Sequence, residues 1–231
     1  MIAAGAIALA SARLGVPSAT FWSDHPNWIM AALFVTIFVP VGQAAAIELG
    51  ERGRRKKLEK EQKVQTLLAS SLIYLATHAG ASWEQTGVQA FVLRGRWRFQ
   101  RHERLTKFRL RAITTSGVAW TKGKGAIGRC WETRQPVYAD LDLEFEDFTD
   151  LSKEEFDALP ADSRYGLTYE DFQKVKGKYG VVAAVPMIDQ RDRYIGCVTA
   201  DMPPGTDDER PLEQEVLKSL ALTAQSIAQV L

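Results

Sequence analysis

The longest apolar run of the chain covers residues 28–47, where twenty successive positions carry no charged side chain. A helix of that length rises about 30 Å, which matches the hydrocarbon core of a bilayer. A basic cluster follows at once, formed by Arg52, Arg54, Arg55, Lys56 and Lys57. The positive-inside rule places such a cluster at the cytoplasmic surface of the membrane. The pattern therefore predicts a membrane anchor at residues 1–49, with a span at 28–49 and the following domain in the cytoplasm.

The residues before this run leave open whether there is a first span. Residues 1–22 are mostly apolar, but Arg13 interrupts them. A signal peptide carries its positive charge before the apolar core, and a charge inside the bilayer costs about 2.5–3.5 kcal/mol on insertion scales. We favour a two-helix hairpin, and the number of spans, one or two, stays open.

Two later segments show a single apolar stripe at helical spacing. The first, 54–77, belongs to a juxtamembrane and signalling segment at 50–80 and carries Leu68, Leu72 and Leu75. The second, 208–231, carries Val216, Leu220 and Ile227 in the same way. A helix with one apolar stripe buries it against a sheet or a partner helix.

Between these helices the pattern changes to that of strands. We expect strands at 88–93, 107–112, 136–139, 181–188 and 194–202, with the last two joined by a polar hairpin turn. A glycine-rich turn, Gly123 to Gly128, opens a short helix that ends near Arg134. This order predicts an α+β domain at 81–231, an antiparallel sheet flanked by helices.

An acidic insertion at 140–178 interrupts the series of strands. Two capping patterns, Ser152 to Glu155 and Thr168 to Asp171, predict two short helices within it. Residues 140–171 hold twelve acidic against two basic side chains, whereas residues 94–111 hold eight basic against one acidic. We favour mutual neutralisation of the two blocks within one domain. Contact of the basic block with anionic lipid, or with single-stranded nucleic acid, is an alternative that we favour less.

Candidate chemistry is sparse. The two cysteines, Cys130 and Cys197, lack metal-ligand or CxxC spacing and are expected to be reduced, buried thiols. The three histidines have no ligand-like spacing, so no metal site is predicted. The pattern GxGxxG at 123–128 matches a dinucleotide fingerprint, but no strand runs into it and no parallel βαβ unit surrounds it.

Two segments carry a resemblance to a known family. Lys122 to Gly128, followed by Pro136, Val137 and Asp140, resembles the central signature of GAF domains. Residues 183–186 and 194–201 are similar to the closing strand pair of that family. The resemblance implies a GAF/PAS-like fold with a small-molecule pocket covered by the insertion, and a homodimer formed through helices 54–77 and 208–231.

On this resemblance we expect the ligand to contact four aromatic side chains near the insertion: Trp120, Tyr138, Tyr165 and Tyr179. No cofactor can be named from the sequence. It lacks the pattern of the cyclic-nucleotide-binding members, a cysteine placed to attach bilin and a histidine pair that would suggest haem. The cysteines used by methionine sulfoxide reductases of the family are missing as well.

The sequence therefore predicts a membrane-anchored sensory or regulatory module without catalysis of its own, which binds a small molecule or a signalling partner. One alternative is a ligand-free module that docks a partner protein at the membrane. A second is a thiol-based redox sensor or a methionine sulfoxide reductase-like enzyme centred on Cys130.

Overall fold

The computed structural model describes the backbone of residues 7–205 and 212–231, apart from residues 8, 12, 15–17, 25, 97–98 and 112–115. Side chains are described for the same residues except positions 19, 22–23, 26, 28–37 and 39–46. The chain divides into two compact units, Met1–Glu59 and Lys60–Leu231.

The first unit contains α2 (Ala19–Asp24) and the beginning of α3 (Pro26–His78). The expected span at 28–49 falls within α3, but most of its side chains lie outside the described residues, as does part of the expected span at 1–22. Among the residues that the structure describes, no helix is long and apolar enough to cross a bilayer. Both spans stay predictions.

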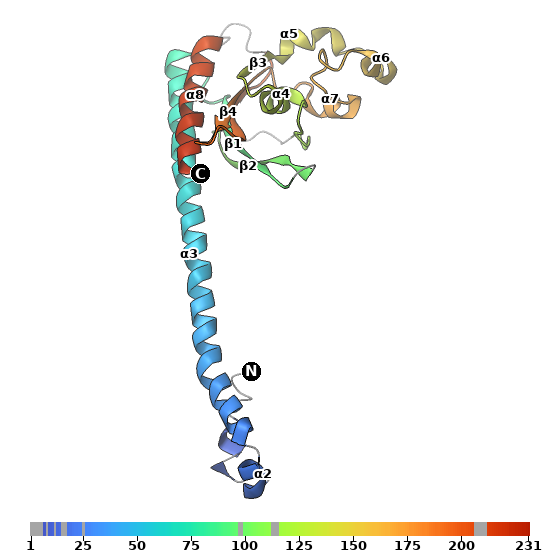
Figure 1. Cartoon of the computed structure of the whole chain (residues 1–231). Coiled ribbons are helices and arrows are strands. Elements are labelled where there is room, and N and C mark those ends of the chain that lie inside the picture. The colour runs from blue at the N-terminus through green and yellow to red at the C-terminus, as the bar shows by residue number, and fades with distance from the viewer. Residues whose placement is uncertain are drawn as a thin grey trace. The chain divides into compact units, whose positions relative to one another are not determined.

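The second unit is built on a five-stranded antiparallel sheet with the strand order β2-β1-β5-β4-β3 (Figure 1). Its strands are β1 (Gly87–Arg94), β2 (Arg101–Phe108), β3 (Val137–Asp140), β4 (Val181–Ile188) and β5 (Tyr194–Met202). The expected antiparallel sheet with flanking helices is confirmed. Strands β4 and β5 have the bounds that the sequence predicts, 181–188 and 194–202.

The position of β2 corrects the sequence prediction, which set this strand at 107–112. The strand ends at Phe108, opposite Val88 of β1, and Leu110 beyond it is half exposed. Strand β2 lies at the edge of the sheet, so its charged side chains are tolerated there, and Arg109 leaves the ladder to bind Asp201. Pairing with β1, rather than local alternation, fixes the register.

Two helices cover one face of the sheet. The end of α3 and α8 (Glu213–Val230) direct their apolar stripes into a common core with the sheet (Figure 1). The helix residues of this core include Val64, Leu68, Leu72, Leu75, Val216, Leu220, Ala224 and Ile227. Between the two helices, the hydroxyls of Ser71 and Ser219 lie 3.1 Å apart in a buried hydrogen bond.

The opposite face carries α4 (Gly125–Thr133) and the insertion, which form a second apolar cluster with the sheet. The insertion contains α5 (Leu141–Glu144), the 3₁₀ turn η2 (Glu146–Phe148), α6 (Lys153–Ala158) and α7 (Tyr169–Val175). Both predicted caps are present: Ser152 forms a capping box with Glu155, and Thr168 accepts a hydrogen bond from the amide of Asp171. The short helices α5 and η2 were not predicted.

Truncation of the helix core tests this arrangement. Leu68→Ala and Leu220→Ala each empty a fully buried position, so we expect a loss of about 2–5 kcal/mol in the free energy of unfolding. Leu222→Ala on the exposed side of α8 is the matched control and should change it by less than about 0.5 kcal/mol. Urea unfolding of the whole chain, followed by tryptophan fluorescence, measures both. Equal effects at positions 220 and 222 would contradict the packing of α8.

Candidate functional site

A pocket of about 350 Å³ lies on the sheet face opposite α3 and α8. Its floor comes from β1, β2, β4 and β5, and its walls come from α4, the loop at 116–120 and the insertion. Its lining includes the aromatic side chains of Phe91, His102, Trp120, Phe145, Tyr165 and Tyr179. A pocket with largely apolar walls and a few polar groups is the usual form of a small-molecule site.

The glycine-rich turn holds the insertion over this pocket. The amide of Gly125 donates a hydrogen bond to the carbonyl of Tyr165 at 2.7 Å. Gly166 follows in the left-handed region (φ +61°), and a Cβ at this position would lie 2.6 Å from the carbonyl oxygen of Gly123. The two backbones can approach this closely only because Gly166 has no side chain. Tyr165 itself has a φ of +52°, which is uncommon for a residue other than glycine.

An ion pair reinforces the same junction. The ammonium of Lys124 lies 2.6 Å from Oδ2 of Asp171, at the start of α7. Burial acts to raise the pKa of Asp171, but the hydrogen bond and the charge of Lys124 outweigh it and lower the pKa. The carboxylate is therefore ionised at neutral pH and links the turn to the insertion.

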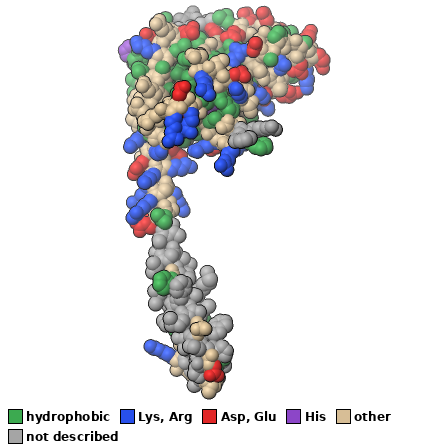
Figure 2. Space-filling model, in the orientation of Figure 1, with side chains coloured by type: hydrophobic (Ala, Val, Ile, Leu, Met, Phe, Trp, Pro, Cys, Tyr) green, Lys and Arg blue, Asp and Glu red, His purple; other side chains and the backbone are tan. Residues whose placement is uncertain are grey.

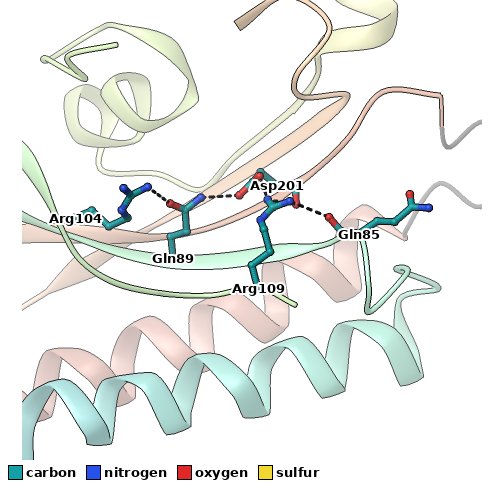
Figure 3. A network of polar contacts seen from close by, with 5 residues as sticks. All are labelled: Gln85, Gln89, Arg104, Arg109 and Asp201. Atoms are coloured by element: carbon teal, nitrogen blue, oxygen red, sulfur yellow. Dashed lines mark hydrogen bonds and ion pairs between the residues drawn. The ribbon is translucent and has the colours of Figure 1, made fainter. Parts of the chain in front are cut away.

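A polar network, buried at Asp201 and Arg109 and exposed at Arg104, crosses the pocket floor (Figure 3). Asp201 accepts a hydrogen bond from Nε2 of Gln89 at 2.7 Å and forms an ion pair with Arg109. Arg109 also donates to the carbonyl of Gln85, and Arg104 donates to Oε1 of Gln89 at 3.1 Å. Burial raises the pKa of Asp201, and the guanidinium of Arg109 opposes that rise. A carboxylate this deeply buried requires such partners.

His102 lies in an aromatic cage beside the pocket, formed by Phe91, Trp131 and Tyr194. Its Nδ1 is 3.2 Å from the carbonyl oxygen of Trp120, which can only accept, so Nδ1 carries the proton. Its Nε2 then accepts from the hydroxyl of Tyr194 at 2.8 Å. Burial lowers the pKa of His102, and the ring is neutral at physiological pH.

Three of the four aromatic residues expected to contact a ligand line the pocket: Trp120, Tyr165 and Tyr179. Tyr138 does not, because its place on β3 turns it toward the core under α3 and α8. That these side chains bind a ligand stays a prediction. The sequence analysis did not identify the polar floor of the pocket. Its signal in the sequence is the occurrence of polar residues within otherwise apolar strands, as at Gln89, Thr199 and Asp201.

The expected membrane-surface cluster lies on the exposed surface of α3. Arg52 and Arg55 form ion pairs with Glu48 and Glu51, one helical turn earlier. All five basic residues, Arg52, Arg54, Arg55, Lys56 and Lys57, are exposed. Their contact with a membrane stays a prediction.

The expected homodimer also stays a prediction. The resemblance to GAF domains implied it, and the apolar stripes of 54–77 and 208–231 are buried in the core with the sheet of one chain. Residues 208–211 lie outside the described part of the chain.

The two cysteines lie together in the pocket-side core, although 66 residues separate them in sequence. Both thiols are free and fully buried. A hydrogen bond with Cys197, together with burial, raises the pKa of Cys130 far above its usual range. A protonated, inaccessible thiol is a poor nucleophile. In the parts of the chain whose residues are described, no cluster suited to a metal ion occurs.

The two blocks of opposite charge are not joined by ion pairs among the described residues. The insertion pairs with Lys124 and, internally, through Lys153 and Glu170 at 2.6 Å. Arg109 of the basic block pairs with Asp201 of β5. Acidic side chains remain gathered at the surface over the insertion (Figure 2).

No family model and no curated protein matches this chain. Among solved structures, it is similar to a type II free methionine-R-sulfoxide reductase from Thermoplasma acidophilum, at 13% identity and a TM-score of 0.45, covering 74% of this chain and 94% of that one. It is also similar to the GAF domain of an Acinetobacter phosphoenolpyruvate-protein phosphotransferase, at 13% identity and a TM-score of 0.42, covering 78% and 92%. A third structure is the PixJ GAF domain from Thermosynechococcus elongatus, at 12% identity and a TM-score of 0.38, covering 75% and 88%. Identities and TM-scores this low leave the function to be inferred from the pocket itself.

The buried, neutral His102 predicts a pH dependence of stability. Because its pKa is lowered in the folded chain, the unfolded chain binds the proton more readily, and stability falls as the pH drops below about 6.5. Urea midpoints of the whole chain between about pH 7.5 and pH 5.5 measure this fall. His102→Gln should flatten it, and His78→Gln, at an exposed position on α3, should not. An unchanged slope in His102→Gln would contradict the assignment.

Gly166→Ala tests how the insertion is held. The methyl group meets the backbone at Gly123, so we expect the contact between Tyr165 and Gly125 to open and residues 141–178 to loosen. Hydrogen exchange of the whole chain should then rise across the insertion but not in β1 and β5. Gly177→Ala, where a Cβ meets nothing within 4 Å although φ is also positive, controls for backbone strain alone. Equal exchange in the two variants would show that the close approach is unimportant.

Proposed function

We propose that the chain is a GAF-like sensory or regulatory module that binds a small molecule in the pocket between the sheet and the acidic insertion. The observation that carries this proposal is the pocket of about 350 Å³ with aromatic walls and a polar floor. Cores of protein domains are close-packed and hold few voids much larger than a water molecule. A pocket of this size, bordered by a partly buried hydrogen-bonded network, fits a ligand better than a packing defect.

The sequence resemblance to GAF domains supports the same proposal. The glycine turn that resembles the family signature supplies Gly125, Ala126 and Ile127 to the pocket wall. The strand pair that resembles the closing strands supplies Val182, Thr199 and Asp201 to its floor. Some of the residues that carry the resemblance, in the glycine turn and in β5, thus border the pocket.

Signalling from the membrane surface is the finer part of the proposal. The apolar run at 28–47 and the basic cluster after it support an anchor with the domain on the cytoplasmic side. Helix α3 contains both this run and the leucines that pack on the sheet. A ligand that favours one arrangement of the domain would shift the population of states that α3 and a dimer partner experience.

The burial of both cysteines argues against the thiol-based alternative. A redox sensor or a reductase of this type needs an accessible thiolate, whereas Cys130 is fully buried with a raised pKa. The alternative of a ligand-free docking module predicts a filled core, and the pocket volume argues against that.

Native mass spectrometry of the whole chain, released gently from mild detergent, tests the proposal. We expect a discrete extra mass that is lost on denaturation. Val182→Phe should abolish this mass, because the larger side chain occupies the pocket floor. It should fold normally, since it fills existing space. Leu222→Phe, at an exposed site on α8, should retain the mass. If the Val182→Phe variant retains the extra mass, the ligand binds outside this pocket.

A further inference from the structure

The polar corner of the pocket carries a surplus of positive charge. Two guanidinium groups, those of Arg104 and Arg109, act on the single carboxylate of Asp201. Arg109 forms the direct ion pair and is buried with it. Arg104 lines the pocket and donates only to the neutral amide of Gln89. Among the described residues that line the pocket, Arg104 is therefore the cation that no carboxylate neutralises directly.

Arg104 is held at the pocket by the network rather than left free on the edge strand (Figure 3). The amide of Gln89 is fixed at one end by Asp201 and at the other by Arg104. Only one of the nitrogens of Arg104 is used in this contact. A guanidinium has five N–H donors, so those remaining can bind a planar anion in two-pronged geometry.

A hydroxyl group also lines the floor of this pocket. Thr199 is opposite Gln89 in the β1–β5 ladder, lines the pocket and is 2% exposed. A hydroxyl can donate a hydrogen bond, so it can bind a carboxylate oxygen of a ligand in the pocket.

The rest of the lining favours a flat ring. Phe91 and Trp120 line the pocket together with Tyr179. Aromatic side chains of this kind stack on, or pack edge-on against, planar ligands. The volume of about 350 Å³ lies near the lower end of the range for ligand pockets, which favours a small molecule.

We propose that the pocket selects small aromatic carboxylates, with the carboxylate bound by Arg104 and Thr199 and the ring held among the aromatic walls. This inference rests on the proposed function and narrows it to one class of ligand. A neutral aromatic of the same shape gains the stacking but leaves the charge of Arg104 without a partner. A cationic one is repelled.

Isothermal titration of the whole chain in mild detergent, with detergent alone as the blank, tests the selectivity. The probes are indole-3-acetate, its neutral amide and the cation tryptamine, which share one ring system. We expect indole-3-acetate to bind at least about tenfold more tightly than the amide, as a charge-assisted hydrogen bond contributes. Tryptamine should not bind measurably.

Matched variants at one edge strand assign the selectivity to Arg104. Arg104→Gln should lower the affinity for indole-3-acetate about tenfold and leave that for the amide unchanged, and Arg104→Lys should restore most of the loss. Arg101→Gln, exposed on the same strand and outside the pocket lining, should behave as the unaltered chain. Thr199→Val should weaken indole-3-acetate binding more than binding of the amide.

The outcomes distinguish a failure of this inference from a failure of the proposed function on which it rests. Equal binding of the acid and the amide, or no binding of the acid, overturns the preference for aromatic carboxylates. The proposed function is contradicted separately if native mass spectrometry finds no bound mass, or finds one that Val182→Phe does not remove. A bound mass identified as a neutral or cationic molecule would keep the function and overturn the inference.

Discussion

Along β5 successive side chains point alternately to the two faces of the sheet, and this alternation determines the layout of the domain. Val198, Ala200 and Met202 enter the core beneath α3 and α8, whereas Cys197, Thr199 and Asp201 face the pocket side. Because the period of a strand is two, a shift by one residue would bring Asp201 under the helices and Val198 to the pocket. Burial of Val198, Ala200 and Met202 under the helices therefore places Cys197, Thr199 and Asp201 on the pocket side.

Asp201 is buried on the pocket side, and a buried carboxylate needs a partner of opposite charge. Arg109 satisfies this need from beyond the end of β2 by crossing over Gly87, which is opposite Asp201 in the ladder. A Cβ at position 87 would overlap the guanidinium, so glycine leaves room for Arg109 in this position. This crossing also explains why β2 ends at Phe108: Arg109 cannot continue the ladder and reach Asp201 at once. The edge of the sheet and the floor of the pocket are thus set by one ion pair.

Local physics made much of this fold predictable from sequence. The apolar runs of β4 and β5, the caps at Ser152 and Thr168, and the glycine turn that opens α4 each depend on neighbouring residues only. The candidate site depends on contacts between distant parts of the chain. Nothing near Arg109 in sequence indicates that it pairs with Asp201, 92 residues later. Tyr138 looked equivalent to Tyr179, but the register of β3 against β4 turns it to the other face.

The same alternation gives the pocket a mechanical connection to the helices. Thr199 and Asp201 border the pocket, and their immediate neighbours Val198 and Ala200 pack in the core with Leu68 and Leu220. A backbone shift of β5 that improved contact with a ligand would therefore change how these side chains meet α3 and α8. Packed interiors respond to such shifts by moving between discrete arrangements rather than by deforming smoothly. Contact alone does not make a switch, since the ligand must also bind one arrangement more tightly than the other. In the proposed function, the insertion that Gly166 and Lys124 join to the glycine turn would supply that difference, if it packs on a bound ligand.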